Sequence, residues 1–251
     1  MAKIISIHSF RGGTGKSNTT ASVTALLAAG GRRVGVIDTD IQSPGIHVLF
    51  GMDETDMVHS LNDYLWGKCD IQETAHDVTA RLGASIKGQV FLIPSSIKAG
   101  EIARVLREGY DVSLLNDGFQ GLIETLNLDV LMIDTHPGLN EETLLSIAIS
   151  DILIIILRPD QQDYQGTAVT VEVARKLDVP RMLLVVNKVL PDFDFTAVQH
   201  EVEKSYGVPV AGVLPLSSEM IRLASRSLFC LQYPDHPLTQ RLRQIAARVM
   251  M

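Results

Sequence analysis

The sequence predicts an α/β fold with a doubly wound, mostly parallel sheet flanked by helices. The first observation is a set of short aliphatic runs that are apolar throughout, as expected of strands buried on both faces. The second is that helical patterns separate several of these runs, which is typical of βαβ units. The runs are Ile4–Ile7, Val34–Ile37, Val90–Ile93, Val130–Ile133, Ile152–Leu157, Met182–Val186 and Val210–Leu214.

Helical patterns follow the first, fifth and sixth of these runs, over Ser17–Ala29, Tyr164–Leu177 and Phe195–Tyr206. Met52–Thr125 is the hardest region to interpret, because it has helical stretches but no motif. No linker rich in Gly, Pro or Ser divides the chain, and no repeat is visible. We therefore expect a single domain over residues 1–251.

Composition excludes several classes of protein. With 46% hydrophobic and 20% charged residues, the chain can form its own core. A net charge of -7 argues against nucleic-acid binding over the whole surface, but leaves room for a local basic patch. The two cysteines, Cys69 and Cys230, form no CxxC motif, so no iron–sulfur cluster is expected.

The sparse use of cysteine suits a reducing compartment. The chain opens with a strand-like segment and not with the apolar core of a signal peptide. Ile152–Leu157, the most apolar run, is far shorter than the roughly 20 residues of a membrane span. A cytoplasmic location is therefore expected.

The strongest motif lies between the first apolar run and the first helix. Residues 8–17 read HSFRGGTGKS, a glycine-rich loop in the context that phosphate binding requires. The free N–H groups of the following helix would face the anion. Lys16 is placed to reach the β- and γ-phosphates, and the Ser17 hydroxyl to bind Mg²⁺. Phe10, however, occupies the first glycine position of the ordinary G-x-x-x-x-G-K-[ST] pattern.

Acidic residues end two other predicted strands. Asp38 and Asp40 follow one strand, and Asp134 follows another, before Thr135-His136-Pro137-Gly138. The carboxyl ends of parallel strands meet at one edge of a sheet, where ligands bind. Asp134 is suited to hold Mg²⁺ through its water shell. The alternative is a set of solvated loop carboxylates.

With Arg11 in place of its first lysine, residues 11–17 fit the deviant pattern K-G-G-x-G-K-[ST]. The chain thereby resembles the ParA/MinD family of deviant Walker A P-loop ATPases. The resemblance implies ATP/ADP and Mg²⁺ as cofactors and hydrolysis of ATP to ADP and phosphate. It implies catalytic roles for Lys16, Asp40 and Arg11, and metal binding by Ser17, Asp38 and Asp134. It implies nucleotide contacts from Gly12, Gly13, Thr14, Gly15, Lys16, Ser17, Asn18, Asn187 and Pro215.

Several of these roles come with alternatives. By resemblance, Asp38 supports the Mg²⁺ site, Asp40 orients or deprotonates the attacking water, and His136 positions its loop. Arg11 is either an arginine finger that reaches the phosphates of a dimer partner or a surface residue that has lost this contact. Asn187 ends a buried strand, where its amide suits an adenine edge. Arg158 is either at a dimer or phosphate contact or simply solvated.

The resemblance implies a positioning or partitioning ATPase. ATP would drive formation of a homodimer, the dimer would bind a matrix, and an activating partner or cargo adaptor would stimulate hydrolysis. An alternative is an Mrp-like iron–sulfur carrier, which the segment from Asp38 resembles, but such carriers use a cysteine pair. Another is a metabolic P-loop enzyme of the same fold.

The C-terminal segment Ser217–Met251 is the candidate for binding the matrix. It contains five arginines against Glu219 and Asp235, a net charge of +3 in an acidic chain. Leu238–Met250 is also amphipathic at helical spacing. Its arginines are suited to nonspecific DNA, which would make the protein nucleoid-associated, while the helix itself is expected to pack on the sheet. A membrane is less favoured, and solvated arginines are the plain alternative.

Overall fold

The computed structural model describes residues 2–251 and contains an eight-stranded sheet with the order β3-β4-β2-β5-β1-β6-β7-β8. All neighbouring strands are parallel except the short β3, which is antiparallel to β4. The strands are β1 (Lys3–His8), β2 (Arg33–Asp38), β3 (His76–Asp77), β4 (Gln89–Ile93), β5 (Val130–Asp134), β6 (Ile152–Leu157), β7 (Met182–Val189) and β8 (Val210–Pro215).

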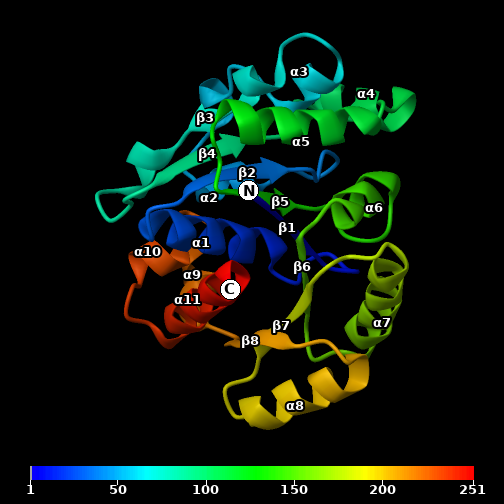
Figure 1. Cartoon of the computed structure of the whole chain (residues 1–251). Helices are drawn as coiled ribbons and strands as arrows, with labels where there is room; N and C mark the ends of the chain where they lie inside the picture. The colour runs from blue at the N-terminus through cyan, green and yellow to red at the C-terminus, as the bar shows by residue number, and fades with distance from the viewer. Residues whose placement is uncertain (1) are drawn as a thin grey trace.

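Helices cover both faces of this sheet (Figure 1). The face built on α1 and α11 shares one apolar core, and the other face has two, under α3–α6 and under α7–α8. The helices are α1 (Lys16–Ala29), α2 (Ile46–Leu49), α3 (Leu61–Leu65), α4 (Ala99–Glu108), α5 (Ser113–Thr125), α6 (Glu141–Ala148), α7 (Gln161–Lys176), α8 (Phe195–Tyr206), α9 (Ser218–Leu223), α10 (Phe229–Gln232) and α11 (Pro237–Met250). The predicted doubly wound, mostly parallel α/β fold is confirmed.

The register of the central strands determines what the sheet presents at its carboxyl edge. Ile7 on β1 lies beside Asp134 on β5, and Asp38 on β2 lies beside the same residue from the other side. The loop after β1 and the carboxylates that end β2 and β5 therefore meet at one edge. The predicted convergence of the loop and the carboxylates at one edge of the sheet is therefore observed.

All seven apolar runs lie in strands, and the ends of the three predicted helices differ from those of α1, α7 and α8 by three residues at most. β3 was not predicted, because its two residues give no periodic signal. Met52–Thr125 supplies β4 and the helices α3, α4 and α5. Phe119 and Leu122 of α5 are fully buried against the sheet, so this region covers one face.

The last helix, α11, packs as expected. His236 caps it by accepting from the N–H of Leu238, and Pro237 occupies its first turn, where no N–H is needed. Its apolar side, which includes Leu242 and Ile245, is buried against β8 and α1. Figure 1 shows blue α1 beside red α11. Within residues 2–251 we find no helix with the length and apolarity needed to cross a bilayer.

A backbone contact at the start of β4 gives a test of the packing. A Cβ at Gly88 would lie 2.0 Å from the carbonyl oxygen of Arg32, which is backbone and has no rotamer to change. We expect Gly88→Ala to lower the free energy of unfolding by about 2 kcal/mol or more, as overpacking does. Urea denaturation would measure the change.

Gly100 provides the matched control. It lies in the first turn of α4, and a Cβ there meets no atom within 4 Å. Gly100→Ala should leave stability unchanged or raise it by roughly 0.4–1 kcal/mol, because the unfolded chain loses freedom. Equal stability losses in the two variants would contradict the packing argument.

Candidate nucleotide site

The loop between β1 and α1 is shaped to hold an anion. Gly15 has φ +100°, a left-handed conformation that favours glycine, and it begins α1 without any side-chain cap. The first N–H groups of α1 therefore lack the side-chain acceptor that commonly satisfies a helix start. A Cβ at Gly15 would also lie 2.4 Å from Nδ2 of Asn187. An approaching phosphate would meet backbone donors and no side chain at this position.

Two polar groups inside the loop also fit an anion. The Thr14 hydroxyl is buried and has no hydrogen-bond partner among the described residues. Lys16 is only 7% exposed, and its positive charge lowers the pKa of His8, Asp40 and Asp134. Its ammonium group thus lies among these side chains at the carboxyl edge, where it would neutralise phosphate charge.

Asp38 and Asp134 are buried opposite each other on β2 and β5. Burial and then repulsion from Asp134 raise the pKa of Asp38 to about 8. Burial raises the pKa of Asp134 to about 6, against the lowering effects of Lys16 and the hydroxyls of Ser17 and Thr20. Two carboxyl groups in this arrangement favour a proton or a cation between them.

The same residues fit Mg²⁺. Carboxylate and hydroxyl oxygens are its preferred ligands, and it keeps several waters and nucleotide phosphates beside one or two carboxylates. Asp38, Asp134 and Ser17 provide this set. In residues 2–251 no three or more His, Cys, Asp or Glu side chains are grouped to hold a metal, so this is no all-protein cage.

Asp38 also organises the loop after β2. Its carboxylate accepts from the N–H groups of Asp40, at 3.0 Å, and Gly45, at 3.0 Å. Asp40 in turn accepts from the N–H of Ser43, and its Oδ1 lies 3.8 Å from Nε2 of His136. Burial raises the pKa of Asp40, while His136 and Lys16 lower it. The loops after β2 and β5 therefore meet at the Asp40–His136 pair.

Two residues of the site, His8 and Lys188, were not predicted. His8 ends β1 and is fully buried, with Nδ1 2.8 Å from the Thr135 hydroxyl, so it joins the phosphate loop to the loop after β5. Burial lowers its pKa to about 3, which keeps it neutral. Lys188 donates to the carbonyl of Gly13 at 2.7 Å. His8 could have been noticed as a histidine at the end of an otherwise apolar strand. Lys188 has no comparable signal in the sequence.

Arg11, in the loop after β1, lies on the surface next to the first turn of α7. Its guanidinium contacts Gln162 and lies 4.0 Å from the carboxylate of Asp160. Next to it, Phe10 occupies the space that a side chain at Gly166 would need, because a Cβ there would lie 2.1 Å from the phenyl ring. The phosphate loop and the first turns of α7 are therefore packed together.

Arg158 has a structural role that was not among the predicted alternatives. Its guanidinium binds both oxygens of the buried Asp163 carboxylate, at 2.8 and 2.9 Å. The Asp163 side chain also accepts from the N–H of Arg158. This bidentate pair is part of the turn between β6 and α7.

A cavity of about 360 Å³ adjoins the loop, within the usual size of ligand pockets. Asn187, two residues before the end of β7, and Pro215, the last residue of β8, lie in its wall. Asn187 does not point freely into it, because Nδ2 donates to the Thr14 carbonyl at 2.7 Å. The cavity is completed by Gly13, Gly15, Lys16, Ser17, Asn18, Thr19, Lys188, Leu214, Leu216, Ser217, Met220, Ile221, Leu238 and Leu242.

Of the sequence-predicted residues, the structure brings the loop, Asp38, Asp40, Asp134, Asn187 and Pro215 to one edge of the sheet.

Comparison with known proteins agrees with this architecture. A protein-family model described as an AAA domain matches residues 2–180. The chain therefore belongs to this AAA-domain family, and it is of the ParA/MinD type, whose deviant phosphate-loop pattern residues 11–17 fit.

Individual proteins make the comparison specific. An uncharacterized ATP-binding protein of Methanocaldococcus jannaschii is 28% identical over all of this chain and 88% of its own length. MinD of Pyrococcus horikoshii, complexed with Mg-ADP, superposes with a TM-score of 0.82 at 22% identity, covering 99% of this chain and 96% of that one. A putative plasmid partition protein of Borrelia burgdorferi, bound to AMPPNP, gives 0.77 at 21% identity, covering 100% and 99%. The two structures show the fold, including the motif-poor region.

Another relative has a different activity. An iron–sulfur cluster carrier protein of Pyrococcus furiosus is 23% identical over 98% of this chain and 85% of its own length. In the present chain Cys69 follows α3 and Cys230 is buried in α10, and both are free cysteines. The two cysteines thus belong to separate elements of the fold.

The carboxyl pair predicts a pH dependence of stability. The pKa of Asp38 is raised in the fold to about 8, from 3.8. Its stabilising contribution is therefore complete below about pH 4 and is lost as the pH rises towards 8. Asp134→Asn removes the repulsion and should make the free energy of unfolding at least about 1 kcal/mol less sensitive to pH across this window.

Urea denaturation of metal-free, nucleotide-free protein at pH 5 and pH 8 would measure this. Asp129→Asn, at a partly exposed position beside Arg32 and Arg33, serves as the matched carboxylate control. If wild type and Asp134→Asn lose the same stability between the two pH values, the buried pair is not responsible.

Proposed function

We propose that this chain is a Mg²⁺-dependent ATPase of the positioning or partitioning type, formed by a single domain. The observation that carries the proposal is the uncapped start of α1 beside the buried pair Asp38 and Asp134. Backbone donors for phosphate and oxygen ligands for a cation occur together at this edge, a combination suited to a metal–nucleotide complex.

Each site residue then has a distinct task. Gly12, Gly13 and Thr14 surround the phosphates, with the N–H groups of residues 15–18. Lys16 neutralises the β- and γ-phosphates, while Ser17, Asp38 and Asp134 hold the metal. Bound Mg²⁺ supplies charge neutralisation for the transferring phosphoryl group. Asn187 and Pro215 border the base, and Asn187 holds the loop through Thr14.

Hydrolysis is assigned to Asp40. It follows the metal residue Asp38 by two positions and is half-buried near Lys16, so its carboxylate can accept a hydrogen bond from the attacking water. His136 lies 3.8 Å from it and helps to hold its orientation. Gly138, with φ +87°, allows the loop after β5 to move with the γ-phosphate.

The active form is proposed to be a homodimer that closes over two ATP molecules. Arg11 supports this: its guanidinium is exposed, and within residues 2–251 its partners are Gln162 of α7 and Asp160, which caps that helix. An arginine finger in trans would leave Gln162 and Asp160 and bind the partner's phosphates bidentately. A closed twofold arrangement uses the same face of both chains.

The proposed matrix is nonspecific DNA, with a membrane less favoured, and a partner protein would stimulate hydrolysis. Four of the five C-terminal arginines also serve the fold: Arg226 caps α9, Arg241 lies over Phe195, and Arg243 and Arg248 bind backbone carbonyls. Arg222 and Arg226 are the best placed for phosphate. They are exposed, and Met220 and Ile221 of the same segment line the nucleotide cavity. DNA binding would make the protein nucleoid-associated within the cytoplasm.

An iron–sulfur carrier is the second candidate, favoured by the Pyrococcus furiosus relative. A cluster shared between two chains needs thiolates at their interface. Cys230 is 2% exposed, and burial raises the pKa of its thiol to about 11, so it is a poor ligand. Cys69 follows α3, in the motif-poor region outside the nucleotide site. We therefore favour the positioning ATPase.

The ATPase proposal predicts a trapped dimer. Asp40→Ala should bind ATP normally but hydrolyse it about 100-fold more slowly or worse, because the residue that orients water is gone. Light scattering with ATP and Mg²⁺ should give about twice the 27.4 kDa of the monomer. A mass that stays at the monomer value with ATP bound would contradict the sandwich dimer.

Lys16→Ala is the companion variant. It removes the loop side chain that neutralises the phosphates bound by its own chain, so ATP binding by calorimetry and ATP-dependent dimerisation should both be lost. Wild-type ATP affinity in this variant would remove the phosphate-loop assignment itself.

The matrix proposal predicts salt-dependent DNA binding. In gel shifts with ATP and Mg²⁺, Arg222→Ala plus Arg226→Ala should weaken binding about tenfold and lower the salt slope by about 2, the number of phosphate contacts removed. The matched control is Arg104→Ala plus Arg107→Ala on α4, another exposed arginine pair. It should bind DNA like the wild type.

A vesicle assay separates the two matrices. With ATP and Mg²⁺, the wild type should stay in the supernatant when anionic liposomes are sedimented. Co-sedimentation together with the absence of a gel shift would reverse the assignment from DNA to membrane.

A further inference from the structure

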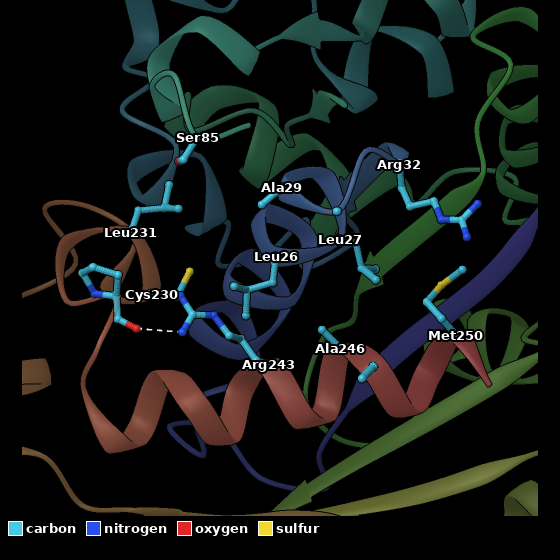
Figure 2. A pocket seen from close by; sticks show the side chains of 13 residues that line it. Leu26, Leu27, Ala29, Arg32, Ser85, Cys230, Leu231, Arg243, Ala246 and Met250 are labelled. Carbon is cyan, nitrogen blue, oxygen red and sulfur yellow. Dashed lines mark hydrogen bonds between the residues drawn. The ribbon is translucent and has the colours of Figure 1, made fainter. Parts of the chain in front are cut away.

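A second cavity, of about 500 Å³, lies away from the nucleotide site (Figure 2). Its floor is formed by the last turn of α1, with Leu26, Leu27 and Ala29, and its side by the second half of α11. α1 starts at the phosphate loop and has 14 residues, so the cavity is about 20 Å from the phosphate site. None of the residues assigned to the nucleotide lines it.

Most of the lining is aliphatic. Small residues of α11, Ala246 and Ala247, form a smooth wall, and Met250 extends it. Besides the Cys230 thiol, only three lining residues have polar side chains: Arg32, Ser85 and Arg243. A peptide would leave most of its backbone amides unpaired here, at a cost for each. The lining instead suits an apolar body with one polar end.

The charge at the polar end is positive. Among residues 2–251, no carboxylate lines the cavity. Arg32 lies 4.0 Å from Asp129, whereas within residues 2–251 Arg243 has no acidic group within 4.0 Å. One nitrogen of Arg243 donates to the Pro234 carbonyl at 2.9 Å, which holds the guanidinium in place. Its other donors can bind a carboxylate or phosphate as a fork.

Figure 2 shows how these groups follow one another. Arg243 and Arg32 lie towards opposite sides of the view, and Leu26, Leu27 and Ala246 lie between them along α1 and α11. A straight aliphatic chain that starts at Arg243 would cover this apolar row. Its burial from water would provide the main driving force, at about 25 cal/mol per Å² of apolar surface.

We propose that this cavity binds a free anionic amphiphile, a medium-chain carboxylate or alkyl phosphate, with the head group on Arg243 and the chain between α1 and α11. The site is independent of ATP hydrolysis in its chemistry. The same two helices nevertheless line both cavities: Lys16 and Leu242 face the nucleotide cavity, and Leu27 and Ala246 face this one.

The test uses sodium decanoate as the probe and calorimetry on the nucleotide-free, full-length protein. The wild type should bind one decanoate saturably, and decyl phosphate likewise. Ala247→Trp fills the groove from an exposed position and should weaken binding at least tenfold. Arg243→Gln removes the charge and should also weaken decanoate binding about tenfold, but should leave binding of uncharged decanol unchanged.

Two variants on the same helix serve as controls. Gln244→Trp places the same ring at the neighbouring exposed position outside the lining, and Arg241→Gln removes an arginine that lies over Phe195. Both should bind decanoate like the wild type. All variants must retain the wild-type circular dichroism spectrum and unfolding midpoint.

Three results would overturn the proposal: no saturable decanoate binding up to millimolar concentration, undiminished binding in Ala247→Trp, or decanol bound by the wild type as tightly as decanoate. Since no nucleotide is present, none of them depends on whether the chain hydrolyses ATP.

Discussion

The mutual repulsion of Asp38 and Asp134 is the constraint around which the carboxyl edge is built. Parallel pairing of β2 with β5 brings the two carboxyl groups opposite each other, both within a few per cent of full burial. Backbone N–H groups from the loop after β2, the charge of Lys16 and the hydroxyl of Thr20 offset part of the cost. The surrounding structure tolerates an energetically poor pair, as expected where stability is given up for ligand binding.

A neutral histidine and two side chains from β7 hold the loops of the site in place. His8 stays uncharged through burial and uses its ring to join β1 to Thr135. Asn187 and Lys188 tie the end of β7 to the carbonyls of Thr14 and Gly13. The loop is therefore anchored from both neighbours, so its open backbone donors are held ready before any anion arrives. Such preorganisation reduces the ordering cost of binding.

The fold was largely predictable from the chain, and the reasons are physical. Fully buried parallel strands leave uninterrupted aliphatic runs, so all seven were visible, whereas the two residues of β3 depend only on pairing with β4. The loop and the carboxylates were predictable because strand ends converge at one edge. The contacts of Arg11 with α7 and of Arg158 with Asp163 were not, because nothing in local sequence tells which distant side chain will share a surface. Met52–Thr125 contains no motif that resembles the family, although the structural match to MinD covers this region as well. This region is held to the sheet by apolar packing, which leaves no recognisable motif in the sequence.

The contact between Phe10 and Gly166 joins two positions that sequence motifs treat as unrelated. The ring fills the volume that any larger residue on α7 would require. The two positions cannot change independently. A bulkier residue at position 166 requires a smaller one at position 10, such as the glycine that the ordinary Walker A pattern has at position 10. In a set of orthologous sequences the two positions should therefore covary in volume, large with small, and a chimaera that takes the loop from one protein and α7 from another should inherit a clash or a void. The departure from the common motif is thus a property of a residue pair and not of the loop alone.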